Sequence, residues 1–134
     1  MTGDVIINKM ETIKRCIKRI REEYDGDPTN LNNYTKQDSI ILNLQRACEA
    51  SIDLAMHVVA EMKLGVPQNS RDAFDMLQEH HVIESELCQR LKAMVGFRNI
   101  AVHDYQAVKN SILKSIIDHH LDDFIVFSDR IKRI

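Results

Sequence analysis

Apolar residues recur at intervals of three and four positions along most of the chain, as they do on the buried faces of helices. The first such series is Ile6, Met10, Ile13, Ile17, Ile20 and Tyr24. It predicts a first helix that Asp4 caps at its N-terminus. Gly26 and Pro28, within the segment DGDPTN at 25–30, are expected to end this helix.

A second, longer helix is expected over about residues 36–64. Thr35 and Asp38 have the spacing of a capping box, and Gly65 and Pro67 follow the last periodic residue. Its apolar face is Ile41, Leu44, Cys48, Ile52, Ala55, Val59 and Met62. Three further apolar residues, Ile40, Leu54 and Val58, fall outside this face and are expected to be exposed. Exposed apolar residues of this kind need cover from another molecule, so they favour a dimer.

The rest of the chain predicts three more helices. A short one over about 71–80, capped by Ser70, buries Phe74 and Leu77, and a fourth begins near residue 84. The fourth helix points Leu87, Leu91, Met94 and Val95 inward. A last helix over about 107–131 has an inward face of Leu113, Ile116, Ile117, Leu121, Phe124, Ile125 and Ile131. With no alternating segment typical of a strand, the predicted fold class is all-α: one domain over 1–134, an up-and-down bundle of four long helices and one short helix.

Composition excludes several functions and favours a cytoplasmic location. The net charge of −2 leaves any nucleic-acid contact to a local basic patch. Three cysteines, Cys16, Cys48 and Cys88, form no C-x-x-C pair, which favours a reducing compartment over a disulfide or zinc framework. No signal peptide, membrane span, glycine-rich phosphate loop, H-E-x-x-H or G-x-S-x-G is found. We therefore expect no cofactor, no metal and no membrane association.

Candidate chemistry gathers at residues 95–106, VGFRNIAVHDYQ. Arg98 supplies a planar charged fork suited to phosphate, and His103 exchanges protons near neutral pH. This is the minimum set for cleaving RNA without a metal: the imidazole moves the proton of the 2′-hydroxyl or of the leaving 5′-oxygen, and the guanidinium stabilises the phosphorane. Asn99 is expected to contact phosphate or hold the arginine in place.

Spacing constrains this site. On a continuous helix, Arg98 and His103 lie about 140° apart, whereas Arg98 and Tyr105 share a face. The helix must end or distort near 100–103, or a second subunit must complete the site. A purely structural interpretation stays open, in which Arg98 and His103 stand at a helix C-terminus where the dipole favours positive charge.

The segment RNIAVHDY resembles the motif of the HEPN-domain superfamily, and specifically of its HepT-like toxins: arginine, four residues, histidine, one residue, tyrosine. The flanking MVGFRN and, in the second helix, LQRACEASIDLAMHVV extend the resemblance over most of the chain. It implies a HEPN four-helix core and a homodimer, within a possible larger hetero-oligomer, whose two motifs face one cleft. It also implies a metal-independent endoribonuclease toxin of a HEPN/MNT (type VII) toxin–antitoxin system.

The resemblance assigns roles residue by residue. It places the catalytic pair on Arg98 and His103, the polar neighbour on Asn99, and the modification target on Tyr105. The implied partner is an MNT-type nucleotidyltransferase antitoxin that silences the toxin by AMPylating Tyr105, and the implied substrate is tRNA or mRNA. Two alternatives remain: a non-catalytic HEPN module that binds a nucleotide or a partner, and a helical dimerisation protein whose motif is structural.

Two weaker patterns have simpler interpretations. Lys14, Arg15, Lys18, Arg19 and Arg21 form a basic stripe on the first helix, which guides an RNA backbone or, more simply, is a solvated face. Asp53, His57 and Glu61 recur every four residues, a spacing that can hold a metal in bundle proteins. Because no second such series accompanies them, we favour a polar seam in which Asp53 orients a motif residue.

Overall fold

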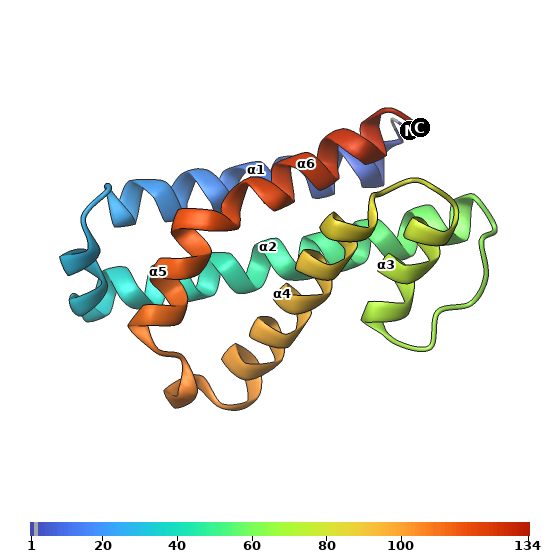
Figure 1. The fold of residues 1–134 in the computed structure, drawn as a ribbon. Coiled ribbons are helices and arrows are strands. Elements are labelled where there is room, and N and C mark those ends of the chain that lie inside the picture. Colours follow the sequence, from blue (N-terminus) through green and yellow to red (C-terminus); the bar gives the residue numbers. More distant parts are fainter. Residues whose placement is uncertain (2) are drawn as a thin grey trace.

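The protein is described here by a computed structural model of residues 1 and 3–134, and within these residues every regular element is helical. Figure 1 shows six α-helices, with a short 3₁₀ helix before α2 and another after α4. Their bounds are α1 Asp4–Tyr24, η1 Pro28–Asn32, α2 Tyr34–Glu61, α3 Ser70–Glu79, α4 Ser85–His103, η2 Tyr105–Ala107, α5 Asn110–His119 and α6 Leu121–Lys132. The all-α prediction is confirmed over this part of the chain, but the count of four long helices and one short helix is wrong.

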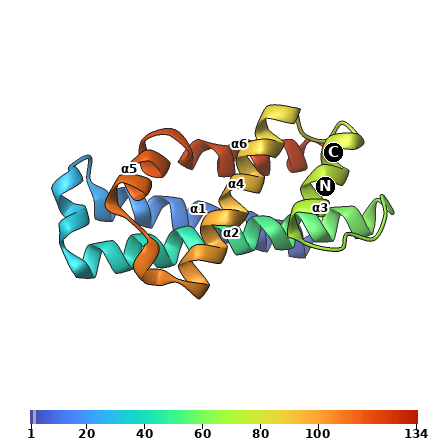
Figure 2. The same ribbon diagram turned by 60° about the horizontal axis from the view of Figure 1, so that its bottom comes forward.

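Helices α1 and α2 lie side by side and form the backbone of the bundle (Figures 1 and 2). The predicted face of α1 is confirmed, with Ile13 and Ile20 fully buried, although Met10 is only half-buried. Asp25 and Gly26 adopt left-handed conformations, with φ of 51° and 66°, and Pro28 opens η1. The expected end of the first helix is therefore confirmed.

The three predicted N-caps are each displaced. Gly3, rather than Asp4, caps α1; Asn33, rather than Thr35, caps α2; and Asn69, rather than Ser70, caps α3. Both asparagine side chains accept a hydrogen bond from the backbone N–H three residues later, which is the N-cap geometry. The predictions failed because several residues suited to capping stand next to one another, and only the backbone shows which one is extended.

Helix α2 is buried on more than one face, and this overturns an expectation. Ile40, Leu54 and Val58 were expected to be exposed, yet each has an exposed fraction of 0%. The reason is that α2 contacts α1, α3, α4 and α6, so it is the central helix of the bundle (Figure 1). These three residues therefore give no argument for a dimer.

The predicted last helix over 107–131 is divided in the structure. Residues 105–107 form η2, and His120 separates α5 from α6 with a non-helical φ of −128°. His120 Nδ1 lies 3.1 Å from Asp123 Oδ2 in the first turn of α6. No glycine or proline marks this break, and both halves keep the helical apolar period, so the sequence gives no signal for it. The break allows α6 to lie along α1 while α5 turns toward η1 (Figure 1).

Candidate active site

The motif predicted from the sequence lies at the C-terminal end of α4 and the start of η2. Leu91, Met94 and Val95 fix the N-terminal part of α4 in the core, as expected. The helix continues through His103 and ends at Asp104, whose backbone N–H still bonds to the Ile100 carbonyl. The chain therefore turns beside the motif, because Tyr105 already belongs to η2.

Arg98 is half-buried and leans toward α2. Its Nε atom is buried, and no hydrogen-bond partner for it is found among the described residues. Burial raises the pKa of the Cys48 thiol on α2 to about 12, and the nearby positive charge of Arg98 opposes that rise. Because Arg98 as a whole is only half-buried, its permanently charged guanidinium is a candidate for binding an anion beside the motif.

Asn99, the neighbour of Arg98, is also half-buried. Within the described part of the chain its side chain makes no hydrogen bond. The expectation that Asn99 holds Arg98 in place is therefore not met by this structure. Contact with phosphate remains its predicted role.

His103 is exposed as the last residue of α4. The helix is unbroken between Arg98 and His103, so the two side chains leave it about 140° apart. The helix thus ends at His103 without a distortion before it, and this ending comes too late to place the pair on one face of one chain. Completion of the site by a second subunit stays a prediction.

Tyr105 turns toward α2, the helix toward which Arg98 also leans. Because the helix ends before Tyr105, the face predicted for a continuous helix does not extend to it, and the placing of Tyr105 beside Arg98 stays a prediction. The Tyr105 hydroxyl donates a hydrogen bond to the Asp38 carboxylate on α2. Partial burial, followed by this bond and the negative charge of Asp38, raises the pKa of Tyr105 to about 12.

Asp38 is a member of the site that sequence reasoning missed. It was assigned to a capping box with Thr35, whereas Asn33 caps the helix and the Asp38 carboxylate is used for Tyr105. The two residues lie 67 positions apart in the chain. No local spacing could have paired them.

An apolar groove adjoins the motif, between α4 and α5. It has a volume of about 540 Å³, and its walls include Met94, Phe97, Ile100, Val108 and Ile112. Ile100 and Ile112 are 42% and 39% exposed, and Val102, which follows on α4, is 48% exposed. The exposed apolar side chains of this groove, Ile100 and Ile112, are of the kind that a second protein chain covers.

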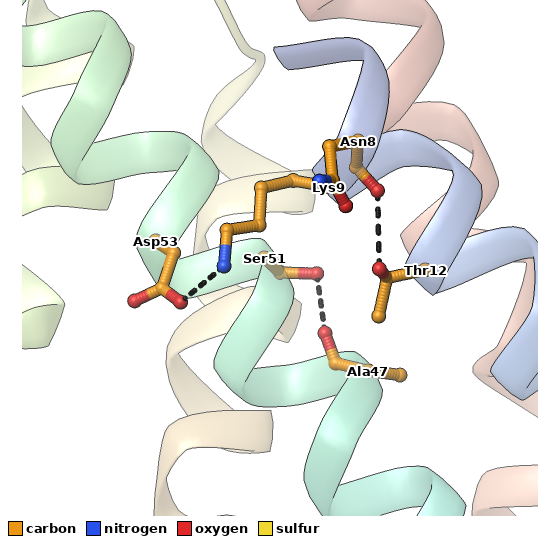
Figure 3. A network of polar contacts seen from close by, with 6 residues as sticks. All are labelled: Asn8, Lys9, Thr12, Ala47, Ser51 and Asp53. Carbon is orange, nitrogen blue, oxygen red and sulfur yellow. Dashed lines mark hydrogen bonds and ion pairs between the residues drawn. The ribbon is translucent and has the colours of Figure 1, made fainter. Parts of the chain in front are cut away.

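The polar series on α2, Asp53, His57 and Glu61, has its contacts with α1 and within α2, and none with the motif is found among the described residues. Lys9 donates a hydrogen bond of 3.0 Å to the Asp53 carboxylate (Figure 3), and His57 Nε2 lies 3.8 Å from Glu61 Oε1. The hypothesis that Asp53 orients a motif residue is therefore wrong.

Along residues 1 and 3–134, no group of three or more His, Cys, Asp or Glu residues could hold a metal ion. No described helix has the length and apolarity that crossing a membrane requires.

Comparison with known proteins places the chain in a family. A family model described as Ribonuclease HepT-like matches residues 12–131. The chain belongs to the HepT-like ribonuclease family.

Two HepT-like relatives show the range of the family. The mRNA nuclease HepT of Shewanella oneidensis is 52% identical over 130 residues, covering 97% of this chain and 98% of the relative. The tRNA nuclease HepT of Aphanizomenon flos-aquae is 25% identical over 105 residues, covering 78% of this chain and 71% of the relative.

Solved structures of HepT-like toxins share the fold. The tri-AMPylated Shewanella oneidensis HEPN toxin, in complex with its MNT antitoxin, superposes with a TM-score of 0.93 at 51% identity. That match covers 99% of this chain and 100% of the solved chain. A toxin–antitoxin structure with AMP-PNP matches with a TM-score of 0.92 at 49% identity, over 99% of this chain and 100% of that one.

Proposed function

We propose that this protein is the toxin of a HEPN/MNT toxin–antitoxin system, a metal-independent endoribonuclease of the cytoplasm. The observation that carries the proposal is the motif end of α4, where Arg98 has an unused buried Nε donor and His103 is exposed two residues before Tyr105. A buried arginine donor without a partner is uncommon at a purely structural helix end, so this one favours a functional role for Arg98. The HepT-like relatives named as nucleases support the same activity.

The proposed reaction uses a transfer within the RNA strand. The 2′-oxygen attacks the adjacent phosphorus, the bond from phosphorus to the 5′-oxygen breaks, and a 2′,3′-cyclic phosphate and a 5′-hydroxyl result. One proton leaves the 2′-hydroxyl and one reaches the departing 5′-oxygen. His103 carries out one of these two transfers, and water or His103 of the partner subunit carries out the other. Arg98 stabilises the negative charge that builds on the phosphorane, and Asn99 contacts a phosphate oxygen.

The separation of Arg98 and His103 on α4 favours a homodimer with a shared cleft. The apolar groove between α4 and α5, with Ile100 and Ile112 at its surface, supplies an area that a second copy would bury. Because this groove adjoins the motif, a two-fold interface there would bring His103 of one subunit toward Arg98 of the other. Both motifs would then face one cleft.

The proposed control of this activity acts on Tyr105. An MNT-type nucleotidyltransferase would transfer AMP from ATP to the phenol oxygen and release pyrophosphate. Esterification removes the proton that Tyr105 donates to Asp38, so the tie between η2 and α2 is lost. The added phosphate stands beside the motif, where it would occupy the place of the RNA backbone. The solved tri-AMPylated toxin–antitoxin complex of a relative supports this proposal.

The first experiment is cleavage of mRNA and tRNA by the purified protein in EDTA, with His103→Ala alongside. We expect discrete products with 2′,3′-cyclic phosphate ends from the wild type alone. If neither protein cuts while both are folded, the ribonuclease is refuted and a non-catalytic HEPN module takes its place. If cleavage requires added magnesium, the metal-independent mechanism is wrong.

Mixing two inactive variants tests the shared cleft. Arg98→Ala and His103→Ala subunits are expected to be inactive alone and active after they are unfolded and refolded together. Random pairing makes half of the dimers mixed, and each mixed dimer has one intact site of two, so activity should return to about a quarter of the wild type. No recovery in proven mixed dimers would show that both residues act within one chain.

A further inference from the structure

A second, strongly basic groove lies between α1 and α2, away from the motif residues themselves. Its volume is about 500 Å³. Arg15, Lys18 and Arg19 line it from α1, and Arg46 lines it from α2. Glu22 is the one carboxylate among its lining residues, and the remainder are Ser39, Leu42 and Asn43. In a chain whose net charge is −2, four cations around one concave surface form a local site of positive potential.

The two arginines that face each other across this groove are available to a ligand. Within residues 1 and 3–134, neither Arg15 nor Arg46 forms an ion pair. Both guanidinium charges oppose the rise that burial causes in the pKa of the Cys16 thiol, which agrees with their places on the two walls of one groove. Glu22 is 3.7 Å from Arg19 and 4.0 Å from Lys18, but these pairs are exposed and weak.

The groove also has a defined place relative to the motif. Ser39, on its wall, directly follows Asp38, the residue that binds the Tyr105 hydroxyl. Helix α2 lies between α1 and α4 (Figure 1) and contacts both, so the groove and the motif flank the same N-terminal half of α2. A strand that leaves the motif across α2 would meet the groove next.

We infer that the groove binds the sugar–phosphate backbone of the RNA strand that extends from the cleavage site. This inference rests on the proposed ribonuclease function. Guanidinium groups bind phosphate oxygens in pairs, and two helices present them here from opposite walls. No aromatic residue is among the lining residues, so the groove has no platform on which a base could stack. It should therefore add affinity for RNA without adding base preference.

The same cations could attract an acidic segment of the antitoxin, but the lining favours RNA. Three of its four cations are arginine, and Ser39 and Asn43 add polar groups of the kind that contact phosphate and sugar. A substrate longer than the cleaved dinucleotide also gains affinity from basic side chains beyond the motif. Binding of the antitoxin is therefore treated as the competing outcome of the test.

The experiment compares Arg15→Gln/Arg46→Gln with Lys132→Gln/Arg133→Gln, which removes the same charge at the exposed C-terminal end of α6. All variants are made in the His103→Ala background for binding and in the wild-type background for cleavage. Fluorescence anisotropy measures binding of labelled poly(U) and of mixed-sequence RNA over a salt series. For single strands each lost phosphate contact changes the salt slope by about 0.7, so the groove variant should lose about 1.4 in slope.

At near-physiological salt the groove variant should bind both RNAs about tenfold more weakly, because two counterion-releasing contacts are missing. In cleavage, KM should rise by a similar factor while kcat stays near the wild-type value, as expected for contacts made equally in the ground and transition states. The control variant should match the protein with an unchanged groove in RNA affinity, in salt slope and in the kinetics of cleavage.

Three outcomes would overturn the inference. The groove variant could match the control, it could lose affinity for one RNA sequence alone, or it could bind RNA normally and lose affinity for the antitoxin. Failure of the proposed function is distinguishable, because then the wild type neither cuts nor binds RNA. In that case the inference falls with it.

Discussion

The Tyr105–Asp38 hydrogen bond offers a direct test of the site geometry through the replacement Asp38→Asn. In the wild type the pKa of Tyr105 is raised from 10.0 to about 12, with burial as the largest cause and the bond and charge of Asp38 after it. Asparagine removes the negative charge but leaves the burial. The pKa of Tyr105 should therefore fall below 12 and remain above 10.

The same shift predicts how stability depends on pH. The pKa of Tyr105 is higher in the folded protein than in the unfolded chain, so the folded state holds this proton more tightly. The resulting stabilisation is fully present below pH 10 and is lost as the pH rises toward about 12. In Asp38→Asn this loss should still begin near pH 10, where the unfolded chain titrates, but it should be smaller and end at a lower pH. Since Tyr105 is 43% exposed, solvent screening keeps the effect small.

The assay is a ¹³C NMR titration of tyrosine labelled at Cζ, with Tyr105→Phe to assign the resonance. Asp118→Asn is the matched control, because the Tyr24 hydroxyl donates to Asp118 over 3.5 Å and the pKa of Tyr24 is also raised. The control should lower the pKa of Tyr24 and leave Tyr105 unchanged. If Asp38→Asn leaves the Tyr105 titration where it was, the reasoning from the bond is refuted.

Three further changes test the core, the motif helix and the apolar groove. Leu54→Ala should lower the free energy of unfolding in urea by about 2–5 kcal/mol, because the Leu54 side chain is fully buried. Leu42→Ala on the same helix should lower it far less, because Leu42 is 42% exposed, and equally small losses for both would contradict the burial of Leu54. Gly96→Ala should raise the melting temperature, since alanine is favoured over glycine in a helix by about 0.5–1 kcal/mol. The new Cβ would lie 3.2 Å from the flexible end of Arg71, which must move slightly, and a lower melting temperature would show that Arg71 cannot move. Ile112→Glu, on the groove between α4 and α5, should shift the protein toward monomer in analytical ultracentrifugation with its helical content unchanged, and an unchanged dimer would place the interface elsewhere.

Local chemistry explains which parts of the helical architecture were predictable. The faces of α1 and α4 follow from apolar spacing alone, and Gly26 with Pro28 ends α1 where the sequence places it. The break at His120 was not predictable, because both α5 and α6 keep the same apolar period across it. Breaks of this kind depend on where each half packs, which is a property of the whole bundle.

The candidate site, too, could be predicted from the sequence only in part. Arg98, Asn99, His103 and Tyr105 stand within eight residues, so their chemistry could be recognised from the sequence. Their orientation could not, since it depends on α4 remaining helical through His103 and ending before Tyr105. That ending places Tyr105 in η2, where its hydroxyl reaches Asp38 on α2.

By itself the sequence determined the helical class, the main buried faces and the motif, because each depends on residues a few positions apart. Only the tertiary structure decided that Ile40, Leu54 and Val58 lie in the core, because α2 is covered by four other helices. It also decided that Asp38 meets Tyr105, and that Arg46 joins Arg15 across a groove. These contacts join residues distant in the chain, and packing rather than local spacing brings such residues together.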